Sequence, residues 1–457
     1  MQLEEKRVLV FGAGKSGIGS AELLAYSKAI PVIYDSNEKL DTEALSEKLP
    51  GGTQIITGAI ENALTEDYDL CVLSPGVPTD LDAVKKIRDK GIRIWGEVEL
   101  AYECSKGSVL AITGTNGKTT TTALLGEIMA AHLGTEKVFV VGNIGNPYTE
   151  AALETEDDSV CVAEISSFQL ETIEKFHPMA AAITNITPDH LDRHHTMEEY
   201  IRVKESITKN MTAQDTIVLN YEDEVLRAFG EGLEKSGAVR VRWFSSKRPV
   251  EPGMYLSGDD LICAEDGKTE KFMSIGEQSL LGEHNYENIC TAVLEALAYG
   301  VPAQTIREAV RSFKAVEHRI EFVDEVDGIA YYNDSKGTNP DAAIKAVKAM
   351  RRPTVLIGGG YDKDAAYDEW IESFTGKVKA LVLVGATREK IAACAKKHGF
   401  EAVHLCDTFE EAFKTCVGLA EEGDAVLLSP ACASWGMFRN YEERGRIFKQ
   451  LVAALKG

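Results

Sequence analysis

Residues 111–125 read AITGTNGKTTTTALL, and this stretch decides the fold class. A strand-like apolar run leads into a glycine-rich loop, and the residues after Lys118 have helical spacing. In such a strand–loop–helix unit, backbone amides and the lysine bind phosphate oxygens, while the hydroxyl of Thr119 is a magnesium ligand. Ile112 stands where a regular GxxxxGK(S/T) loop has its first glycine, so a turn without a ligand is the alternative. The stretch predicts a nucleotide-binding parallel α/β sheet.

Short apolar strands alternate with helical stretches along all 457 residues, and this pattern restarts three times. The alternation predicts an α/β protein with three domains. We expect a Rossmann-like N-terminal domain over residues 1–96, a central P-loop ATPase-type parallel-sheet domain over 97–315, and a C-terminal Rossmann-like α/β domain over 316–457. Ligands of such sheets bind at the carboxyl ends of the strands. The loops that follow the strands are therefore the candidate site.

Composition excludes several classes of protein. The net charge of -23 disfavours a nucleic-acid partner, since phosphate backbones bind basic surfaces. The start, MQLEEKRVLVFG, has no signal-peptide pattern, and no apolar run reaches the length of a membrane span, so we expect a cytoplasmic protein without a membrane partner. Nine scattered cysteines without a CxxC pair favour neither disulfides nor a zinc site, and most are expected to be small buried residues.

The stretch FGAGKSG near the N-terminus follows a strand and carries glycines 12, 14 and 17 at GxGxxG spacing. Asp35 ends the next strand, which completes the dinucleotide-binding fingerprint. Amides at the helix start would face a diphosphate, and Asp35 could accept hydrogen bonds from a ribose or base. A structural turn without a ligand is the alternative. An NAD-linked oxidoreductase would fit this loop but would leave the Lys118 loop unexplained.

Two carboxylate-bearing segments indicate a metal. Glu164 lies inside the apolar run SVCVAEISS, where a carboxylate is costly unless it meets a cation. The segment NITPDHLDRHH places Asp189, His190, Asp192 and His194 directly after another strand. We interpret this set as a metal-binding cluster in which one of the histidines is an ordinary loop residue.

Lys204 falls on the apolar stripe of a helix predicted over residues 196–207. Thr196 and Glu199 stand in capping-box register at its start. The stripe consists of Tyr200, Val203 and Ile207. Lys204 could extend its ammonium to water, or it could face inward near the metal, where burial would neutralise the amine for chemical modification. Spacing alone leaves both interpretations open.

Several motifs together resemble the Mur ligase family of bacterial cell-wall synthesis. They are TGTNGKTTTT, GNIG, EISSFQLE, NITPDHLDRH, GEHNYEN, EHRIEFV, NDSKGTNPDA and LLSPACASWGMF, and they span nearly the whole chain. The irregular phosphate loop is itself the family form. GAGKSG, NDSKGTN and SPACASW make the D-glutamate-adding members the most similar branch. Another amino-acid-adding member, a folylpolyglutamate synthase and a non-enzymatic nucleotide switch are the alternatives.

The resemblance implies an ATP-dependent amide ligase that acts in peptidoglycan precursor synthesis in a bacterial cytoplasm. ATP would phosphorylate the terminal carboxylate of UDP-N-acetylmuramoyl-L-alanine, and the amine of D-glutamate would then attack the acyl phosphate. The implied cofactors are ATP and magnesium, with a carbamylated lysine at Lys204. A monomer is expected.

The resemblance also implies roles for individual residues. Lys118, His190 and Lys204 would be catalytic. The magnesium ligands would be Thr119, Glu164, His190 and the carbamate on Lys204. ATP would be bound by Gly114, Thr115, Asn116, Gly117, Lys118, Thr119, Thr120, Asn285, Asn288, Arg319 and Asp334. The UDP substrate would be bound by Lys15, Ser16, Asp35, Ser36, Ser74, Gly76 and Asn143. D-Glutamate would be bound by Lys336, Thr338, Lys363, Ser434 and Tyr441, of which Ser434 and Tyr441 could instead be packing residues. Cys432 could be a nucleophile, but no His/Asp partner is patterned around it, which favours a small buried residue.

Overall fold

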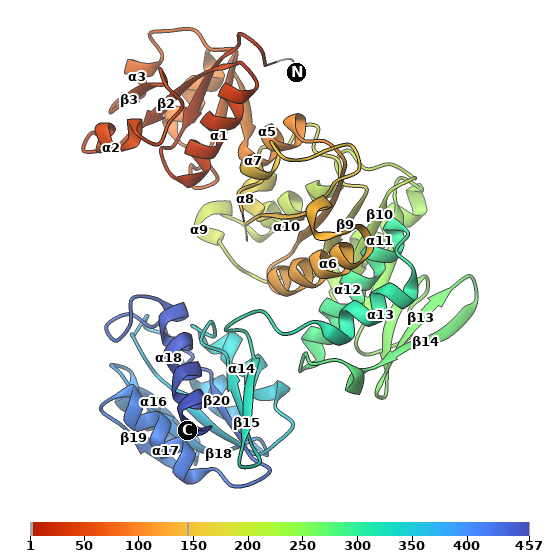
Figure 1. Cartoon of the computed structure of the whole chain (residues 1–457), viewed down its shortest axis with the longest axis vertical. Helices are drawn as coiled ribbons and strands as arrows, with labels where there is room; N and C mark the ends of the chain where they lie inside the picture. The colour runs from red at the N-terminus through yellow and green to blue at the C-terminus, as the bar shows by residue number, and fades with distance from the viewer. Residues whose placement is uncertain (1–2, 144–145, 457) are drawn as a thin grey trace. The chain divides into compact units, whose positions relative to one another are not determined.

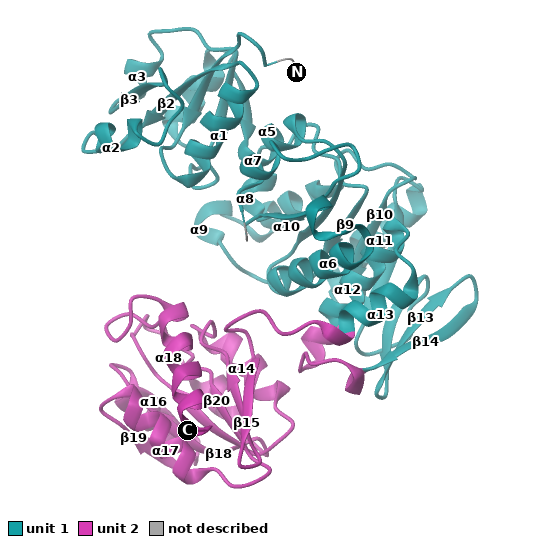
Figure 2. Ribbon diagram, viewed as in Figure 1, with its two compact units in different colours: residues 1–274, 287–310 teal, residues 275–286, 311–457 magenta. Residues whose placement is uncertain are grey.

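The computed structural model describes residues 3–143 and 146–456. The chain divides into two compact units, one of residues 1–274 and 287–310, the other of residues 275–286 and 311–457 (Figure 2). Unit 1 holds two sheets and unit 2 holds one, in the order of the three predicted blocks (Figure 1). The boundaries predicted at 96/97 and 315/316 stay predictions.

The first sheet has the strand order β3-β2-β1-β4-β5, and all its pairings are parallel. Its strands are β1 (Arg7–Phe11), β2 (Ile30–Asp35), β3 (Gln54–Thr57), β4 (Leu70–Leu73) and β5 (Arg93–Gly96). The chain adds strands on one side of β1 up to β3 and then on the other side from β4 onward. At such a switch point, between β1 and β4, the loops diverge and leave a crevice for a ligand. The glycine loop follows β1 and therefore borders this crevice.

The second sheet has the order β14-β13-β12-β11-β10-β9-β6-β8-β7. Its strands are β6 (Ser108–Thr113), β7 (Val138–Gly142), β8 (Val160–Glu164), β9 (Ala180–Ile183), β10 (Thr216–Asn220), β11 (Arg240–Ser245), β12 (Gly253–Ser257), β13 (Asp260–Glu265) and β14 (Lys268–Ser274). Strands β6 to β12 are parallel as predicted, but β13 and β14 extend the sheet antiparallel. Tight turns at Gly258 and Gly267, both with positive φ, make this hairpin extension possible.

The third sheet, in unit 2, has the order β15-β16-β20-β17-β18-β19. Its strands are β15 (Glu321–Val326), β16 (Ile329–Asn333), β17 (Thr354–Gly358), β18 (Val378–Leu383), β19 (Val403–Leu405) and β20 (Ala425–Leu428). Only β15 runs antiparallel to its neighbour among the strands of this sheet. Separate apolar cores lie on the two faces, one with Trp370 and one with Phe448, so helices cover both sides.

Helices fill the connections between the strands. In unit 1 they are α1 (Lys15–Tyr26), α2 (Thr42–Ser46), α3 (Ile60–Ala63), α4 (Asp82–Asp89), α5 (Glu97–Cys104), α6 (Lys118–Leu133), α7 (Tyr148–Ala151), α8 (Ser167–Leu170), α9 (Leu191–His194), α10 (Met197–Glu205) and α11 (Glu224–Ser236). Two helices, α12 (Glu283–Tyr299) and α13 (Ala303–Ser312), include residues of both units. In unit 2 they are α14 (Pro340–Ala349), α15 (Asp368–Glu372), α16 (Arg388–Lys397), α17 (Phe409–Leu419) and α18 (Tyr441–Ala453). No helix of the described chain is long and apolar enough to cross a membrane.

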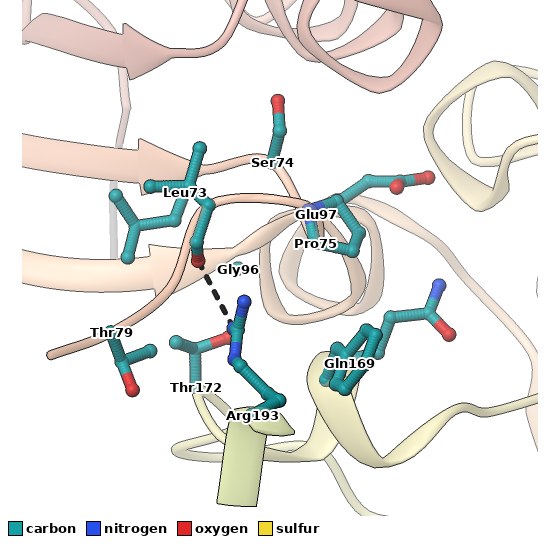
Figure 3. Close-up of a pocket in the computed structure, with 11 residues that line it drawn as sticks. Leu73, Ser74, Pro75, Thr79, Gly96, Glu97, Gln169, Thr172 and Arg193 are labelled. Atoms are coloured by element: carbon teal, nitrogen blue, oxygen red, sulfur yellow. Dashed lines mark hydrogen bonds between the residues drawn. The ribbon is translucent and has the colours of Figure 1, made fainter. Parts of the chain in front are cut away.

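A polar seam joins the two sheets of unit 1. Arg193 donates two hydrogen bonds to the Glu171 carboxylate, at 2.7 and 3.1 Å, and one to the Val77 carbonyl, at 3.1 Å. Thr79 donates to the same carboxylate at 3.1 Å. Figure 3 shows Arg193 and Thr79 of this seam, which help to line a cavity of about 10 Å³. Residues after β4 are thus tied to residues between β8 and β10.

None of the nine cysteines, all of which are among the described residues, forms a disulfide. Six of them are buried, which confirms the prediction that most are small buried residues. The partly buried ones are Cys104, Cys263 and Cys394.

Candidate nucleotide and substrate sites

The phosphate loop connects β6 to α6 and requires its two glycines. Gly114 has a φ of +139°, and a Cβ there would come within 1.9 Å of the Thr184 hydroxyl. Gly117, with a φ of +88°, occupies the N-cap of α6. Positive φ and close packing leave glycine as the residue that fits both positions. The backbone therefore enters the helix as a phosphate-binding loop does.

The loop is held in place by the segment that follows β9. The amides of Thr115 and Asn116 donate to the backbone and side-chain oxygens of Asn185, each at 2.9 Å. The hydroxyl of Thr184 donates to the Asn116 carbonyl at 2.6 Å. Because these bonds fix the loop before any nucleotide arrives, little ordering is left for binding. Lys118 donates to the carbonyls of Gly114 and Thr115, at 2.8 and 2.9 Å, which holds its ammonium against the loop.

The first turn of α6 carries Thr119, which is partly exposed, and Thr120, which is buried. Asn288 on α12 also lies against the loop, because a Cβ at Gly117 would come within 2.4 Å of its side-chain oxygen. The hydroxyl of Thr121 donates to that oxygen at 3.3 Å. Asn285, the other asparagine of this helix predicted to bind ATP, belongs to unit 2 and donates to the Leu281 carbonyl at 2.7 Å. Asn288 is thus the asparagine that the structure brings to the phosphate loop.

Glu164 ends β8 beside Ile112 of β6 and is almost fully buried. One carboxylate oxygen accepts a hydrogen bond from the Asn143 amide at 2.8 Å. The other oxygen is buried and has no hydrogen-bond partner among the described residues. A buried carboxylate oxygen without a partner is costly, and a cation would satisfy it. The site therefore fits the predicted metal ligand.

Lys204 lies on α10 and is 1% exposed, so of the two interpretations left open the inward-facing one holds. Its ammonium donates to the Gly114 carbonyl at 2.9 Å and lies 4.9 Å from the centre of the Tyr200 ring. Burial, and secondly the charge of Lys118, lower the pKa of Lys204 to about 7. Much of the amine is therefore neutral near physiological pH, as chemical modification of a lysine requires.

The cluster after β9 separates into different environments. His190 has a half-exposed ring that stacks edge-on against Phe168, with centroids 5.0 Å apart. His194 is buried and hydrogen-bonded to the Ser167 hydroxyl at 2.9 Å, so its role is in packing. Asp192 is exposed, whereas the charge of Asp189 acts on Lys204. His190 is thus the histidine that remains open to a ligand.

A cavity of about 490 Å³ lies between the two sheets of unit 1. It is lined by Gly14, Lys15, Ser16, Ser74, Pro75, Gly76, Glu97, Gly142, Asn143, Pro147 and Gln169. Five of the seven residues predicted to bind the UDP substrate share this cavity, and Asp35 and Ser36 are outside its lining. The motif GNIG ends in Ile144 and Gly145, which lie outside the described residues.

Asp35 shapes the glycine loop. One carboxylate oxygen accepts from the Ala13 amide at 3.0 Å, and the other accepts from the Asn37 amide at 2.9 Å. A Cβ at Gly17 would come within 1.9 Å of the Gly12 carbonyl oxygen, which explains the third glycine by close packing. The glycines and Asp35 of the fingerprint therefore hold the loop in shape, whether or not a ligand binds there.

Glu97 and Gln169 line the same cavity, and sequence reasoning missed both. Glu97 is buried at the start of α5, and the side chain of Ser16 hydrogen-bonds to it. Burial raises the pKa of Glu97, and that hydrogen bond opposes the rise. Its position at the carboxyl end of β5 was a usable signal, since ligands gather at strand ends.

In unit 2, three loops follow the neighbouring strands β16, β20 and β17 and carry the residues predicted for D-glutamate. The ammonium of Lys336 lies 5.4 Å from the Tyr441 ring, and that of Lys363 lies 4.9 Å from the Trp435 ring. Thr338 is partly buried in the loop after β16, and Ser434 is buried in the loop after β20. The three loops thus present two cations on aromatic rings at one edge of the sheet.

Asp334 is buried directly after β16. Its oxygens accept from the Ser429 hydroxyl at 2.7 Å and from the Ile320 amide at 3.2 Å. Burial raises the pKa of Asp334 to about 7, against the opposing effects of Ser429 and Arg319. The Nε of Arg319 is buried without a hydrogen-bond partner in the described ranges. Arg319 and Asp334, both predicted to bind ATP, therefore lie at the same strand end.

Arg444 is a buried cation that sequence reasoning missed. It lies on α18, 1% exposed, and donates to the Ser335 hydroxyl and carbonyl at 2.9 and 2.7 Å. A third bond, at 3.2 Å, reaches the Cys432 carbonyl. Burial lowers the pKa of Arg444 to about 10. The side chain therefore clamps the loop after β16 to the loop after β20.

Cys432 is buried, with its sulfur 3.1 Å from the Tyr367 hydroxyl and 3.3 Å from that of Thr387. Burial raises the pKa of its thiol. These contacts agree with a small buried residue and not with an activated nucleophile.

A phosphate loop beside a buried lysine and a buried carboxylate with one unpartnered oxygen, on a chain with three sheets covered by helices, defines a nucleotide-dependent α/β enzyme. The chain matches the Mur ligase MurD-like N-terminal domain over residues 6–96, the Mur ligase middle domain over 112–296, and the Mur ligase glutamate ligase domain over 318–432. It is 54% identical to the UDP-N-acetylmuramoylalanine–D-glutamate ligase of Lachnoclostridium phytofermentans, over 99% of this chain and 98% of that protein. The ligase of the same name from Clostridioides difficile is 43% identical and is covered completely. The chain belongs to the Mur ligase family.

Solved structures agree on the fold. MurC from Thermotoga maritima has a TM-score of 0.59 at 18% identity, covering 98% of this chain and 99% of that chain. MurF from the same organism, in complex with ADP, has a TM-score of 0.58 at 17% identity, covering 99% of each chain. The predicted three-domain α/β fold is therefore confirmed.

Proposed function

We propose that this chain is an ATP-dependent ligase that joins D-glutamate to UDP-N-acetylmuramoyl-L-alanine in peptidoglycan precursor synthesis. Relatives that are 43–54% identical along the whole chain carry the name of this ligase. The observation that carries the proposal is the phosphate loop with Lys204 and the unpartnered oxygen of Glu164 beside it. That set suits transfer of a phosphoryl group to a carboxylate.

The reaction needs ATP because a carboxylate is a poor electrophile. Transfer of the γ-phosphoryl group to the terminal carboxylate forms an acyl phosphate and releases ADP. The amine of D-glutamate attacks the acyl carbon, and the tetrahedral intermediate collapses to an amide and inorganic phosphate. The loop amides and the Lys118 ammonium neutralise phosphate charge and align the reactants, which are the main contributions of a protein to phosphoryl transfer.

Magnesium, when bound, would neutralise charge on the nucleotide phosphates. We infer that Thr119 and Glu164 hold one magnesium ion, and that His190 and a carbamate on Lys204 hold a second. A carbamate forms when a neutral amine adds to carbon dioxide and loses a proton. Lys204 suits this step because burial lowers its pKa to about 7. A carbamate supplies oxygen ligands, which magnesium prefers.

We assign the cavity of unit 1 to the UDP substrate. The helix α1 begins at Lys15 on its border, and amides at a helix start favour a diphosphate. D-Glutamate is assigned to the strand-end loops of unit 2, since the lysines at 336 and 363 suit an amino acid with two carboxylates. We also propose a cytoplasmic monomer without nucleic-acid or membrane partners. Each substrate of the proposed reaction thus has a candidate binding site on the chain.

The deciding experiment measures phosphate release from ATP in the presence of UDP-N-acetylmuramoyl-L-alanine. D-Glutamate is compared with L-glutamate, L-alanine, L-lysine and diaminopimelate. We expect release with D-glutamate alone and an amide product of the matching mass. The Lys118→Ala variant should lose turnover because its loop lacks the phosphate-binding charge. Release with a different amino acid would reassign the acceptor, and no release with any of them would overturn the ligase reaction.

A further inference from the structure

Two helices in the outer layer of unit 2 each present a pair of metal-ligating residues. Helix α15 carries Asp368 and Glu372, while α16 carries Cys394 and is capped by His398. In both pairs the residues are four positions apart, so they lie on one face of their helix. Neither pair takes part in the substrate sites described above.

The two pairs face each other. One ligand atom from each of Asp368, Cys394 and His398 lies within 4.8 Å of the other two. The Nε2 of His398 is 2.8 Å from an Asp368 oxygen, and its Nδ1 is 3.5 Å from a Glu372 oxygen. All three residues of the cluster are partly buried. Small side-chain rotations would bring the three atoms to the spacing that one ion requires, because metal–ligand bonds of about 2.0–2.3 Å separate neighbouring ligands by less than 4 Å.

We propose that Asp368, Cys394 and His398 form a binding site for a borderline-soft divalent cation of the zinc class, with water as the fourth ligand. A thiolate and an imidazole select zinc or cobalt, whereas magnesium and calcium prefer sites made of oxygen ligands alone. The Asp368 carboxylate and a Cys394 thiolate, with the Glu372 carboxylate close by, leave the site anionic despite the positive charge of Lys397 on Asp368. Binding releases the thiol proton of Cys394 to solvent.

The competing explanation is an ion-pair network. Asp368 accepts from Lys397 at 2.6 Å and from His398 at 2.8 Å, so these three residues satisfy one another without a metal. That network accounts for the carboxylate and the imidazole but gives no role to the cysteine sulfur that faces them. The sequence pattern of DxxxE and CxxxH in separate segments also explains why no CxxC signal marked the site.

The test titrates the full-length protein, stripped with a chelator, with Co²⁺ and then with Zn²⁺. We expect a thiolate-to-cobalt charge-transfer band and visible bands of a tetrahedral ion, both removed by one equivalent of Zn²⁺. Cobalt held by carboxylates or imidazoles elsewhere, as at Glu164, gives no thiolate band. The readout is therefore independent of the proposed ligase activity and can fail or succeed without it.

Variants locate the ion. Cys394→Ser should abolish the charge-transfer band, and His398→Ala should weaken Co²⁺ binding by at least about tenfold. Cys263→Ser and His404→Ala are matched controls, because each removes a partly buried residue of the same type outside the cluster. Circular dichroism checks that all four variants are folded. Absence of the band in the wild type, or its persistence in Cys394→Ser, would overturn the proposal and leave the ion-pair network.

Discussion

Each unit of the molecule buries one cation on an apolar helix stripe, and the two cations differ in chemistry. Lys204 in unit 1 donates to the Gly114 carbonyl and, at 3.4 Å, to the Thr113 hydroxyl. Arg444 in unit 2 makes three bonds, to two backbone carbonyls and one hydroxyl. Burial lowers the pKa to about 7 for the lysine but only to about 10 for the arginine.

The difference indicates two uses of a buried cation. Arginine remains charged and presents several donors in a fixed plane, which suits it to holding loops in place. Lysine is a point charge whose proton is lost readily on burial, which suits it to reaction with an electrophile. The comparison therefore supports the proposed chemical role of Lys204, whereas the hydrogen bonds of Arg444 position two loops.

The largest effect should come from removing the lysine. Lys204→Ala is expected to lower ligase turnover by about 10²- to 10³-fold, since charge stabilisation by one group contributes that much. Short carboxylates such as acetate should restore part of the activity by replacing the carbamate. Lys204→Arg should stay inactive because a guanidinium keeps its charge. Phosphate release measures the activity of both variants and the rescue by acetate, with the exposed Arg202→Ala as control. Full activity in Lys204→Ala would show that Lys204 has no chemical role.

Removing the arginine should affect stability more than chemistry. Arg444→Met leaves buried oxygens of Ser335 and Cys432 without a donor, and each such loss costs about 1–3 kcal/mol. We expect the free energy of unfolding to fall by about 3 kcal/mol in urea titrations. Arg446→Met, on the exposed face of the same helix, should change it by less than about 0.5 kcal/mol. Equal effects of the two substitutions would contradict the clamp.

The pH dependence of stability should separate the two cations. The pKa of Lys204 is about 7 when folded and 10.5 ordinarily, so between these values the unfolded chain binds more protons. Its contribution to the free energy of unfolding therefore rises with pH, by about 1.4 kcal/mol per unit, and is flat below about pH 7. Lys204→Met should remove this slope in bicarbonate-free buffer, whereas Arg444→Met should leave it unchanged. An unchanged slope in Lys204→Met would mean that the folded lysine keeps its proton.

The smallest effect should come from trimming one partner of the arginine. Ser335→Ala removes the hydroxyl that accepts from Arg444 and donates to the Tyr441 carbonyl at 2.8 Å. A loss of about 1 kcal/mol is expected, because the carbonyl bonds of Arg444 remain. The double variant with Arg444→Met should lose less than the sum of the single losses. Additive losses would show that the serine and the arginine act independently.

The sequence predicted those parts of the fold that depend on local pattern. Strands such as β6 and β17 are apolar runs that end at glycine or polar loops. The sequence therefore predicted both the strands and the edge of the sheet at which a ligand would bind. The strand β3 is only partly buried, and β14 is mostly exposed, so neither has an apolar pattern that marks a strand. The antiparallel hairpin extension was missed for this reason.

The site residues also differ in whether a local sequence pattern marks them. Lys204 was noticed because a charge stood on an apolar stripe. Arg444 stands on an equivalent stripe with Phe448 and Val452, so the same signal was present there. Its partner Ser335 is 109 positions away, and only the packing of three strand-end loops brings the two together. Assignments that depend on such distant contacts cannot follow from spacing.

The polar seam between the two sheets of unit 1 has a consequence for protein engineering. Arg193 and Glu171 belong to the segment around β9, but they bond to Val77 and Thr79 after β4. A chimera that exchanges only residues 6–96 between relatives would keep one half of this matched set and replace the other. A graft of the N-terminal domain should therefore include Glu171 and Arg193 from the same donor protein. The segment to be exchanged is set by these hydrogen bonds and not by the domain boundary in the sequence.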